Sequence, residues 1–337
     1  MLGLAGLAGV NSCQPTPPPP QPDTVHVMVL DEFPAHRDSR STTHGTLVEQ
    51  VLRSQRPVQN ERIQVSLGAS MEAVHSRQPG GLEDYVVQRF TVPTRATAEA
   101  LRAMEGPGVA SQSQGSSPSR VVESLWNEAH HRPEIRSFLE SELGLAAGSS
   151  DAELLQALVH RVDDLRQSHP EIRSARRELL GAARSASEQG IIRVLSAGNN
   201  GHLDNTLERL QVSIPRDFYW SDLADPAAII VGAADLRGTL DPADDMAAAI
   251  ASPGAGALVG AQGVDVPIRV DGELQHHTGS SYAQPQVAAL VVGWLQAEPG
   301  LTRDQIAVRL QQVARPIPGG EAKIGAGIID SEWNLTR

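Results

Sequence analysis

Aromatic side chains and cysteine are scarce in this chain. Phe, Trp and Tyr make up only 3% of its 337 residues, so leucine, valine, isoleucine and alanine must supply most of the core. The single cysteine, Cys13, excludes an intrachain disulfide. No apolar run reaches the roughly 18 residues that a transmembrane helix needs, so the sequence predicts no membrane span.

Basic residues are also outnumbered. The chain has 28 Lys and Arg against 40 Asp and Glu, which gives a net charge of −12. Such a charge repels phosphate backbones and anionic bilayers, and it argues against nucleic acid or an anionic membrane surface as a partner. The remaining composition, 40% hydrophobic and 20% charged, is typical of a globular protein.

The N-terminal segment consists of small and apolar residues up to Cys13, and four consecutive prolines follow soon after. The letters Val-Asn-Ser-Cys at 10–13 resemble a bacterial lipoprotein signal, in which the cysteine is lipidated. We therefore expect a signal segment at 1–13, a stiff Pro-rich tether at 14–23, and a protein that is lipid-anchored in the bacterial cell envelope or secreted. The alternative is a disordered N-terminus with an incidental cysteine, since no Lys or Arg forms the basic region of a signal peptide.

Short apolar runs alternate with helical patterns from residue 24 to residue 337, which we expect to form one domain. Near-continuous apolar runs suit parallel strands buried on both faces, and they predict strands at 25–30, 62–67, 85–92, 109–115, 191–195, 227–233 and 264–270. Helices are expected at 47–52, 95–104, 118–170, 175–189, 287–295 and 302–314, with capping boxes at Ser150 and Thr302. This order predicts an α/β fold with a mostly parallel sheet flanked by helices.

Polar side chains stand at the ends of several of these elements. Asp31 ends the first strand, at the edge where functional residues of parallel sheets gather. His44 opens a helix, and Asn199 follows a strand in a Gly-rich turn. Ser281 lies where a turn enters an apolar helix, and free N–H groups there favour developing negative charge. Taken singly, each also has an ordinary interpretation: a strand-ending Asp, a surface histidine, an Asn-Gly turn and a helix cap.

Taken together, these motifs resemble the subtilisin-like serine peptidases, or subtilases. The family pattern is a strand ending in Asp, then His-Gly-Thr, then Ala-Gly-Asn, then Gly-Thr-Ser-x-Ala-x-Pro. In the same order this chain has Val-Leu-Asp at 29–31, His-Gly-Thr at 44–46, Ala-Gly-Asn at 197–199 and Gly-Ser-Ser-Tyr-Ala-Gln-Pro at 279–285. The resemblance covers residues 25–330 and implies a three-layer subtilisin-like fold.

The resemblance also implies a role for each motif residue in hydrolysing peptide bonds of a protein or peptide substrate. Ser281, rather than its neighbour Ser280, would be the nucleophile. His44 would take and return its proton, and Asp31 would orient His44 and stabilise the imidazolium. The amide of Asn199, rather than that of the adjacent Asn200, and the Ser281 backbone N–H would form the oxyanion hole.

Two segments carry the Ser-x-Gly letters of the family's substrate-pairing strand. We prefer Ser113 and Gly115 over Ser66–Gly68, because the former follow a helix in the expected order, and an extended substrate would pair there as an added strand. No cofactor is expected for the chemistry, and no His/Glu zinc motif is present. Structural calcium is common in the family, but its sites cannot be identified from this sequence.

Two departures from the family pattern leave alternatives open. The connection from Asp31 to His44 is short, although about 13 extended residues can span roughly 40 Å. The helical region 118–170 is an expected insertion between the substrate-pairing strand and the oxyanion segment. A subtilisin-fold binding or assembly protein without catalysis is therefore one alternative. A serine hydrolase on another α/β fold is a weaker one, since Gly-x-Ser-x-Gly is absent around Ser281.

Overall fold

A computed structural model describes residues 25–32, 42–58, 63–67, 80–237 and 243–330. Cys13, the tether at 14–23 and Gly68 lie outside these ranges. The described strands of the main sheet follow the order β2-β1-β3-β4-β5-β6, and β7 also pairs with β5. All of these pairings are parallel except that of β5 with β6. The strands are β1 (His26–Asp31), β2 (Ile63–Leu67), β3 (Gly108–Gln112), β4 (Ile191–Ser196), β5 (Ile229–Asp235), β6 (Met246–Ala247) and β7 (Val259–Gln262).

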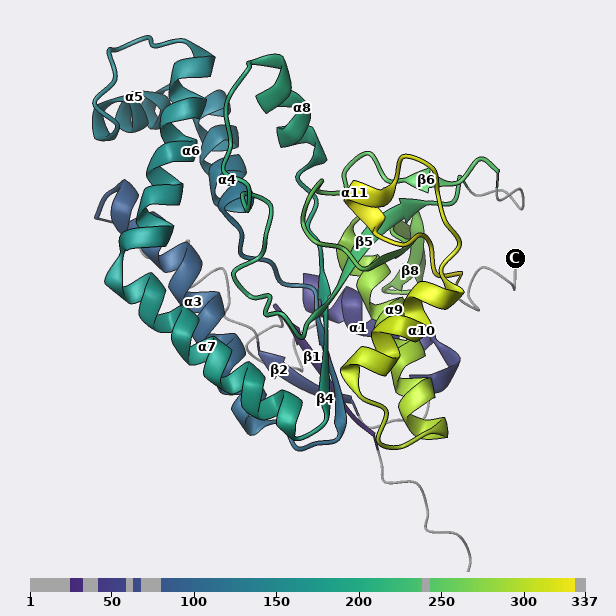
Figure 1. The fold of residues 1–337 in the computed structure, drawn as a ribbon. Coiled ribbons are helices and arrows are strands. Elements are labelled where there is room, and N and C mark those ends of the chain that lie inside the picture. Colours follow the sequence, from purple (N-terminus) through teal and green to yellow (C-terminus); the bar gives the residue numbers. More distant parts are fainter. Residues whose placement is uncertain (1–24, 33–41, 59–62, 68–79, 238–242, 331–337) are drawn as a thin grey trace, which may run out of the picture.

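Helices cover both faces of this sheet, so the fold has three layers (Figure 1). Side chains alternate across a strand. Val27 and Val29 of β1 therefore join the core beneath α1 (His44–Ser54), α9 (Ser280–Ala297) and α10 (Arg303–Val313). Met28 and Leu30 join the core beneath α3 (Leu82–Ala103) and α7 (Pro170–Glu188). This architecture is the expected α/β, three-layer subtilisin-like fold.

The predicted strand at 85–92 is wrong, because those residues lie within α3. The β-branched and aromatic residues of this stretch suggested a strand, but burial follows a helical spacing, with Val86 and Phe90 four residues apart and both nearly inaccessible. Pro93 lies inside the same helix. Proline has no N–H to offer the carbonyl four residues earlier, that of Arg89. The Ser116 hydroxyl donates to that carbonyl instead, at 3.2 Å.

The helical region predicted at 118–170 is confirmed as helical. It comprises α4 (Pro118–His131), α5 (Pro133–Glu142) and α6 (Asp151–Ser168), and α7 follows directly. The capping box at the start of α6 is present: the backbone N–H of Glu153 donates to Ser150 Oγ, and the Ser150 N–H donates to the Glu153 carboxylate. Together α4–α7 form a helical unit on one side of the sheet (Figure 1).

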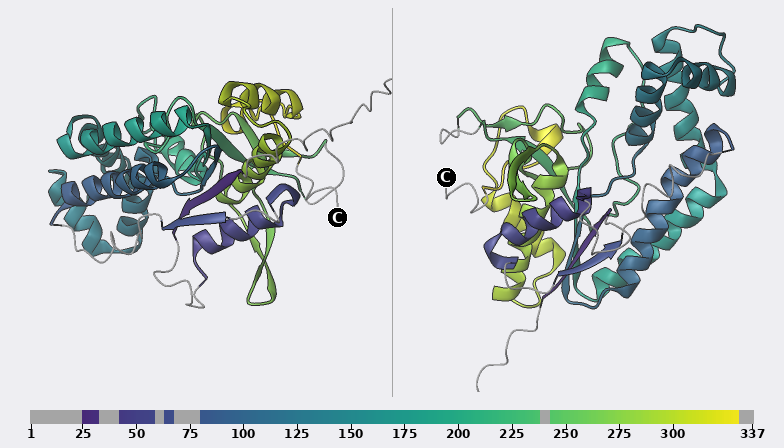
Figure 2. Two further views of the ribbon diagram at one scale, coloured as in Figure 1. Left: turned by 90° about the horizontal axis from the view of Figure 1, so that it is seen from below. Right: turned by 180° about the vertical axis from the view of Figure 1, so that it is seen from behind.

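The remaining elements complete the described chain. They are η1 (Arg56–Val58), α8 (Gly201–Arg209), the antiparallel hairpin of β8 (Val266–Val270) and β9 (Glu273–His277), and α11 (Glu321–Ile324). Figure 2 shows the same layers from below and from behind, with the hairpin projecting from the body. Within the described ranges, no helix combines the length and apolarity needed to cross a bilayer.

Candidate active site

The six residues predicted for catalysis and substrate binding line one cleft. The cleft has a volume of about 410 Å³ and lies at the carboxyl ends of β1, β3 and β4. Parallel strands bring such ends to a single edge of the sheet. Its lining includes Asp31, His44, Ser113, Gly115, Asn199 and Ser281.

Asp31 and His44 are joined by a hydrogen bond. His44 Nδ1 lies 2.8 Å from Asp31 Oδ1, and the Asp31 side chain is almost completely buried. The short connection between them closes at Glu32, whose carbonyl accepts bonds from Thr43 Oγ1 at 2.9 Å and from the Gly45 N–H at 2.8 Å. These bonds fix the start of α1 against the end of β1. The two described ends of the connection from Asp31 to His44 are therefore hydrogen-bonded to each other.

The electrostatic surroundings of His44 favour its protonated form. Burial opposes charge on the imidazole, but the hydrogen bond that His44 donates to Asp31 and the negative charge of Asp31 outweigh burial and raise the His44 pKa above its usual value. The stability that this pair adds is therefore present below the unfolded histidine pKa and is lost as pH rises through the folded value. A general base must start neutral, so the raised pKa also sets the lower pH limit of the chemistry.

We expect the acid limb of the pH profile of kcat/KM to lie above the usual histidine pKa of about 6.5. In Asp31→Asn, the charge that raises the His44 pKa is absent while burial remains, so the limb should move to lower pH. The residual activity of this variant, measured from pH 5 to 9 at constant ionic strength, tests the shift. An acid limb that stays in place would contradict this source of the raised pKa.

Ser281 lies in the first turn of α9 and is held there by its neighbours. Its carbonyl accepts a bond from Ser113 Oγ at 3.1 Å. The next residue, Tyr282, places its ring 5.8 Å from the His44 ring, which packs the start of α9 against the start of α1. The serine and the histidine therefore enter the same cleft from two packed helices.

Ser280 and Asn199 hold the turn after β4 against α9. The Ser280 N–H donates to Asn199 Oδ1 at 2.8 Å, and the Gly198 N–H donates to Ser280 Oγ at 3.1 Å. The side-chain oxygen of Asn199 thus accepts a hydrogen bond from the turn. The amide nitrogen of Asn199 lies beside Gly279, since a Cβ added at Gly279 would sit 3.1 Å from that nitrogen. Asn199 is therefore oriented by the turn that carries Ser281.

Asn200 has a structural environment instead. Its side chain is buried, its amide donates to Glu123 Oε2 at 2.7 Å, and its oxygen accepts bonds from Ser119 and Ser252 at 3.0 and 3.3 Å. These contacts occupy both ends of the amide. They favour Asn199 over Asn200 as the oxyanion donor.

The segment from Ser113 to Gly115 directly follows β3, between β1 and β4 in the sheet. Ser113 Oγ donates to the backbone of Ser281 and toward the side chain of Gln284. A Cβ built on Gly115 meets nothing within 4 Å, so that edge of the cleft is open. Ser66 lies on β2, on the other side of β1 from β3.

Other cleft residues were not predicted from the sequence. Ser116, Ser117 and Arg120 line the cleft from the start of α4, Arg89 from α3, and Tyr219 and Ser221 from an irregular segment after α8. None of them belongs to a local motif, because their positions result from contacts between distant segments. In the described residues, no three His, Cys, Asp or Glu side chains come together to hold a metal ion, so we assign no side-chain calcium site.

Comparisons with known proteins identify the family and the fold of this chain. A family model described as the Subtilase family matches residues 31–327. A search of curated proteins returned no match. Fervidolysin from Fervidobacterium pennivorans, a keratinolytic enzyme related to subtilisin, is 17% identical with a TM-score of 0.50; the alignment covers 94% of this chain but only 43% of that one.

Two further solved structures are covered over most of their length and have lower scores. A cold adapted subtilisin-like serine proteinase is 17% identical with a TM-score of 0.46, covering 91% of this chain and 88% of that one. A lanthipeptide protease is 14% identical with a TM-score of 0.49, covering 94% and 87%. At these identities the similarity concerns the fold alone.

Proposed function

Because the chain belongs to the subtilase family, we propose that it is a serine endopeptidase acting through Asp31, His44 and Ser281. The observation that carries this proposal is the 2.8 Å bond between His44 and buried Asp31 in the cleft that Ser281 also lines. A serine hydroxyl is a weak nucleophile until a neighbouring base accepts its proton. The cleft contains that base and the carboxylate that orients it.

The proposed reaction follows from these positions. Asp31 accepts the Nδ1–H of His44, which leaves Nε2 free to take the Ser281 proton as Oγ attacks the peptide carbonyl. The Asn199 amide and the Ser281 N–H donate to the resulting oxyanion. His44 then gives the proton to the leaving amine, and water releases the acyl group by the same steps in reverse order. The substrate backbone lies beside Ser113 and Gly115 as an added strand.

The open cleft supports catalysis over the binding-protein alternative. A groove filled by the helical unit would favour a protein that only binds or assembles. Gly115 instead borders open space, and the start of α4 contributes Ser117 and Arg120 to the lining while a cleft of about 410 Å³ remains open. Protein or peptide substrates can therefore approach Ser281.

Digestion of a denatured protein and of a random peptide library tests the proposed activity. Wild-type protein should release internal cleavage products, and Ser281→Ala should release none. Ser280→Ala is the matched control, since it should keep measurable activity even though it loosens the turn that holds Asn199. Equal activity of Ser281→Ala and wild type would contradict the proposal.

Export is proposed from the sequence at 10–13 alone, with Cys13 as the site of lipidation. Expression in a bacterial host with labelled fatty acid should give a labelled, membrane-associated protein. Cys13→Ser should abolish the label and release the protein from the membrane fraction. Labelling that is equal in both proteins would contradict a lipid anchor at this residue.

A further inference from the structure

One wall of the cleft has no regular secondary structure of its own. It consists of residues 216–222, here termed the wall segment, and Tyr219 and Ser221 from it line the cleft. The wall segment is bonded to the residues just after the substrate-pairing segment. The Asp222 N–H donates to the Ser116 carbonyl at 2.5 Å, and the Ser119 N–H donates to the Phe218 carbonyl at 3.1 Å.

Ser116 connects this wall to α3 as well. Its N–H donates to Ser221 Oγ at 3.4 Å, and its hydroxyl donates to the Arg89 carbonyl at 3.2 Å. Ser116 lies one residue beyond Gly115, at the edge where a substrate would pair. A displacement of the wall segment would therefore move Ser116, and with it the adjacent substrate-pairing edge.

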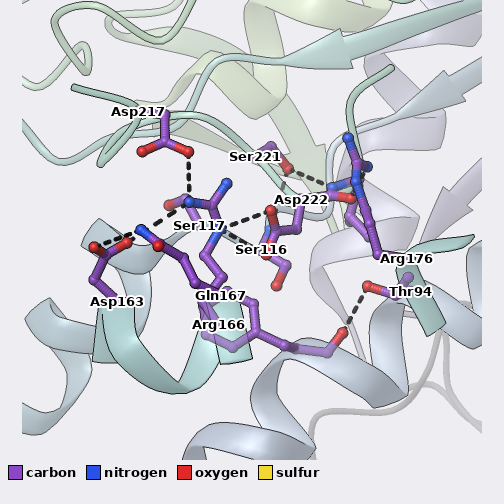
Figure 3. A network of polar contacts seen from close by, with 12 residues as sticks. Thr94, Ser116, Ser117, Asp163, Arg166, Gln167, Arg176, Asp217, Ser221 and Asp222 are labelled. Atoms are coloured by element: carbon purple, nitrogen blue, oxygen red, sulfur yellow. Dashed lines mark hydrogen bonds and ion pairs between the residues drawn. The ribbon is translucent and has the colours of Figure 1, made fainter. Parts of the chain in front are cut away.

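The wall segment is anchored from behind by the helical unit (Figure 3). Arg166 of α6 binds Asp222 through a bifurcated hydrogen bond, with Nε 2.9 and 3.1 Å from the two carboxylate oxygens. Arg166 Nη1 also lies 2.6 Å from Asp217 Oδ2, near the other end of the segment. From α7, Arg176 donates to the Asp222 carbonyl. One side chain on α6 thus holds two points of the wall.

The charges make this anchor difficult to replace. Burial raises the pKa of Asp222, and Arg166 and Arg176 act against that increase. Burial opposes the charge of Arg166, yet Asp222 and Asp217 raise its pKa above the usual value. Without Arg166, the carboxylate of Asp222 would remain buried away from water and would lose the guanidinium that compensates its charge. Removing one member of such a pair is strongly destabilising for the segment that carries the other.

We propose that Arg166 is a positioning residue for the substrate cleft, and that through it the helical unit sets the wall formed by Tyr219 and Ser221. This inference rests on the proposed peptidase function. Through Arg166, the helical unit then supports a substrate-binding wall. This contact does not involve Asp31 or His44. Its effect should fall on substrate binding and leave the reactivity of Ser281 unchanged.

Arg166→Met tests this, with Arg161→Met as the matched control. Arg161 lies on the same helix, is more exposed, and pairs with Glu83 of α3 instead of the wall segment. For peptides that span the cleft, Arg166→Met should raise KM about tenfold or more and lower kcat much less. Its labelling rate with a small fluorophosphonate should stay within about twofold of wild type, because that probe does not use the wall. Arg161→Met should match wild type in both assays.

Amide hydrogen exchange separates failure of this inference from failure of the proposed activity. In a Ser281→Ala background, Arg166→Met should speed exchange at residues 216–222 and leave that of α9 unchanged, whether or not the protein is a peptidase. Asp217→Asn, which removes a half-exposed partner of Arg166, should give a smaller change of the same kind even if Arg166→Met fails to fold. Wild-type exchange at 216–222 in these variants, or a wild-type KM in an active Arg166→Met enzyme, would overturn the inference.

Discussion

His44→Ala is expected to lower kcat for peptide hydrolysis by on the order of 10⁶-fold, or about 8 kcal/mol in the activation free energy. The imidazole of His44 is hydrogen-bonded to Asp31 and shares the cleft with Ser281. Without it, neither proton transfer can occur, and the hydroxyl of Ser281 stays a weak nucleophile. Steady-state kinetics with a peptide found in the library digest provide the measurement.

His160→Ala is the matched control for that substitution. His160 is exposed on α6 and contacts Gln156, far along the chain from the cleft residues. It should keep wild-type kcat and KM. A His44→Ala enzyme that retains a tenth of wild-type activity would show that another group serves as the base.

Asn199→Ala is expected to lower kcat by about 10²–10³-fold, or about 3 kcal/mol, with little change in KM. The reason is that an oxyanion donor is used most strongly when charge develops on the substrate oxygen. Because Asn199 Oδ1 also accepts the Ser280 N–H, Asn199→Asp provides a second test: it keeps that acceptor and loses the amide donor. Both variants should lose kcat to a similar extent.

Asn200→Ala should behave differently. Its amide is bonded to Glu123 and its oxygen to two serines, so the substitution leaves buried polar groups without partners. The expected loss is in the free energy of unfolding, about 1–3 kcal/mol, measured by chemical denaturation. A large kcat effect at Asn200 with none at Asn199 would reverse the two assignments.

Much of the candidate site could be predicted because its residues lie at the ends of regular elements. Asp31 ends a buried strand, Asn199 follows another, and His44 and Ser281 open helices. A parallel sheet brings strand ends to one edge, which predicts neighbouring positions for Asp31 and Asn199, and the resemblance to the subtilases implies that His44 and Ser281 join them. The short connection before His44 is bridged at its two described ends by the bond from Thr43 Oγ1 to the Glu32 carbonyl.

The parts that were not predicted depend on contacts between distant residues. The composition of 85–92 predicts a strand, whereas the burial of Val86 and Phe90, four residues apart on one face of α3, shows a helical period. The wall segment has no motif, since Arg166 reaches Asp217 and Asp222 across 51 and 56 residues of sequence. A sequence lists such partners without indicating which of them meet. Ion-pair networks between an insertion and a loop are therefore found only in the folded structure.

Covalent labelling by a fluorophosphonate probe, followed by mapping of the modified residue by mass spectrometry, tests the central claim most directly. The probe reacts with a serine only when a neighbouring base and an oxyanion hole activate it. Wild-type protein should be modified at Ser281 in a time-dependent reaction, and His44→Ala should react far more slowly. A folded wild-type protein that stays unlabelled at Ser281, or that is labelled at another serine instead, would contradict the account.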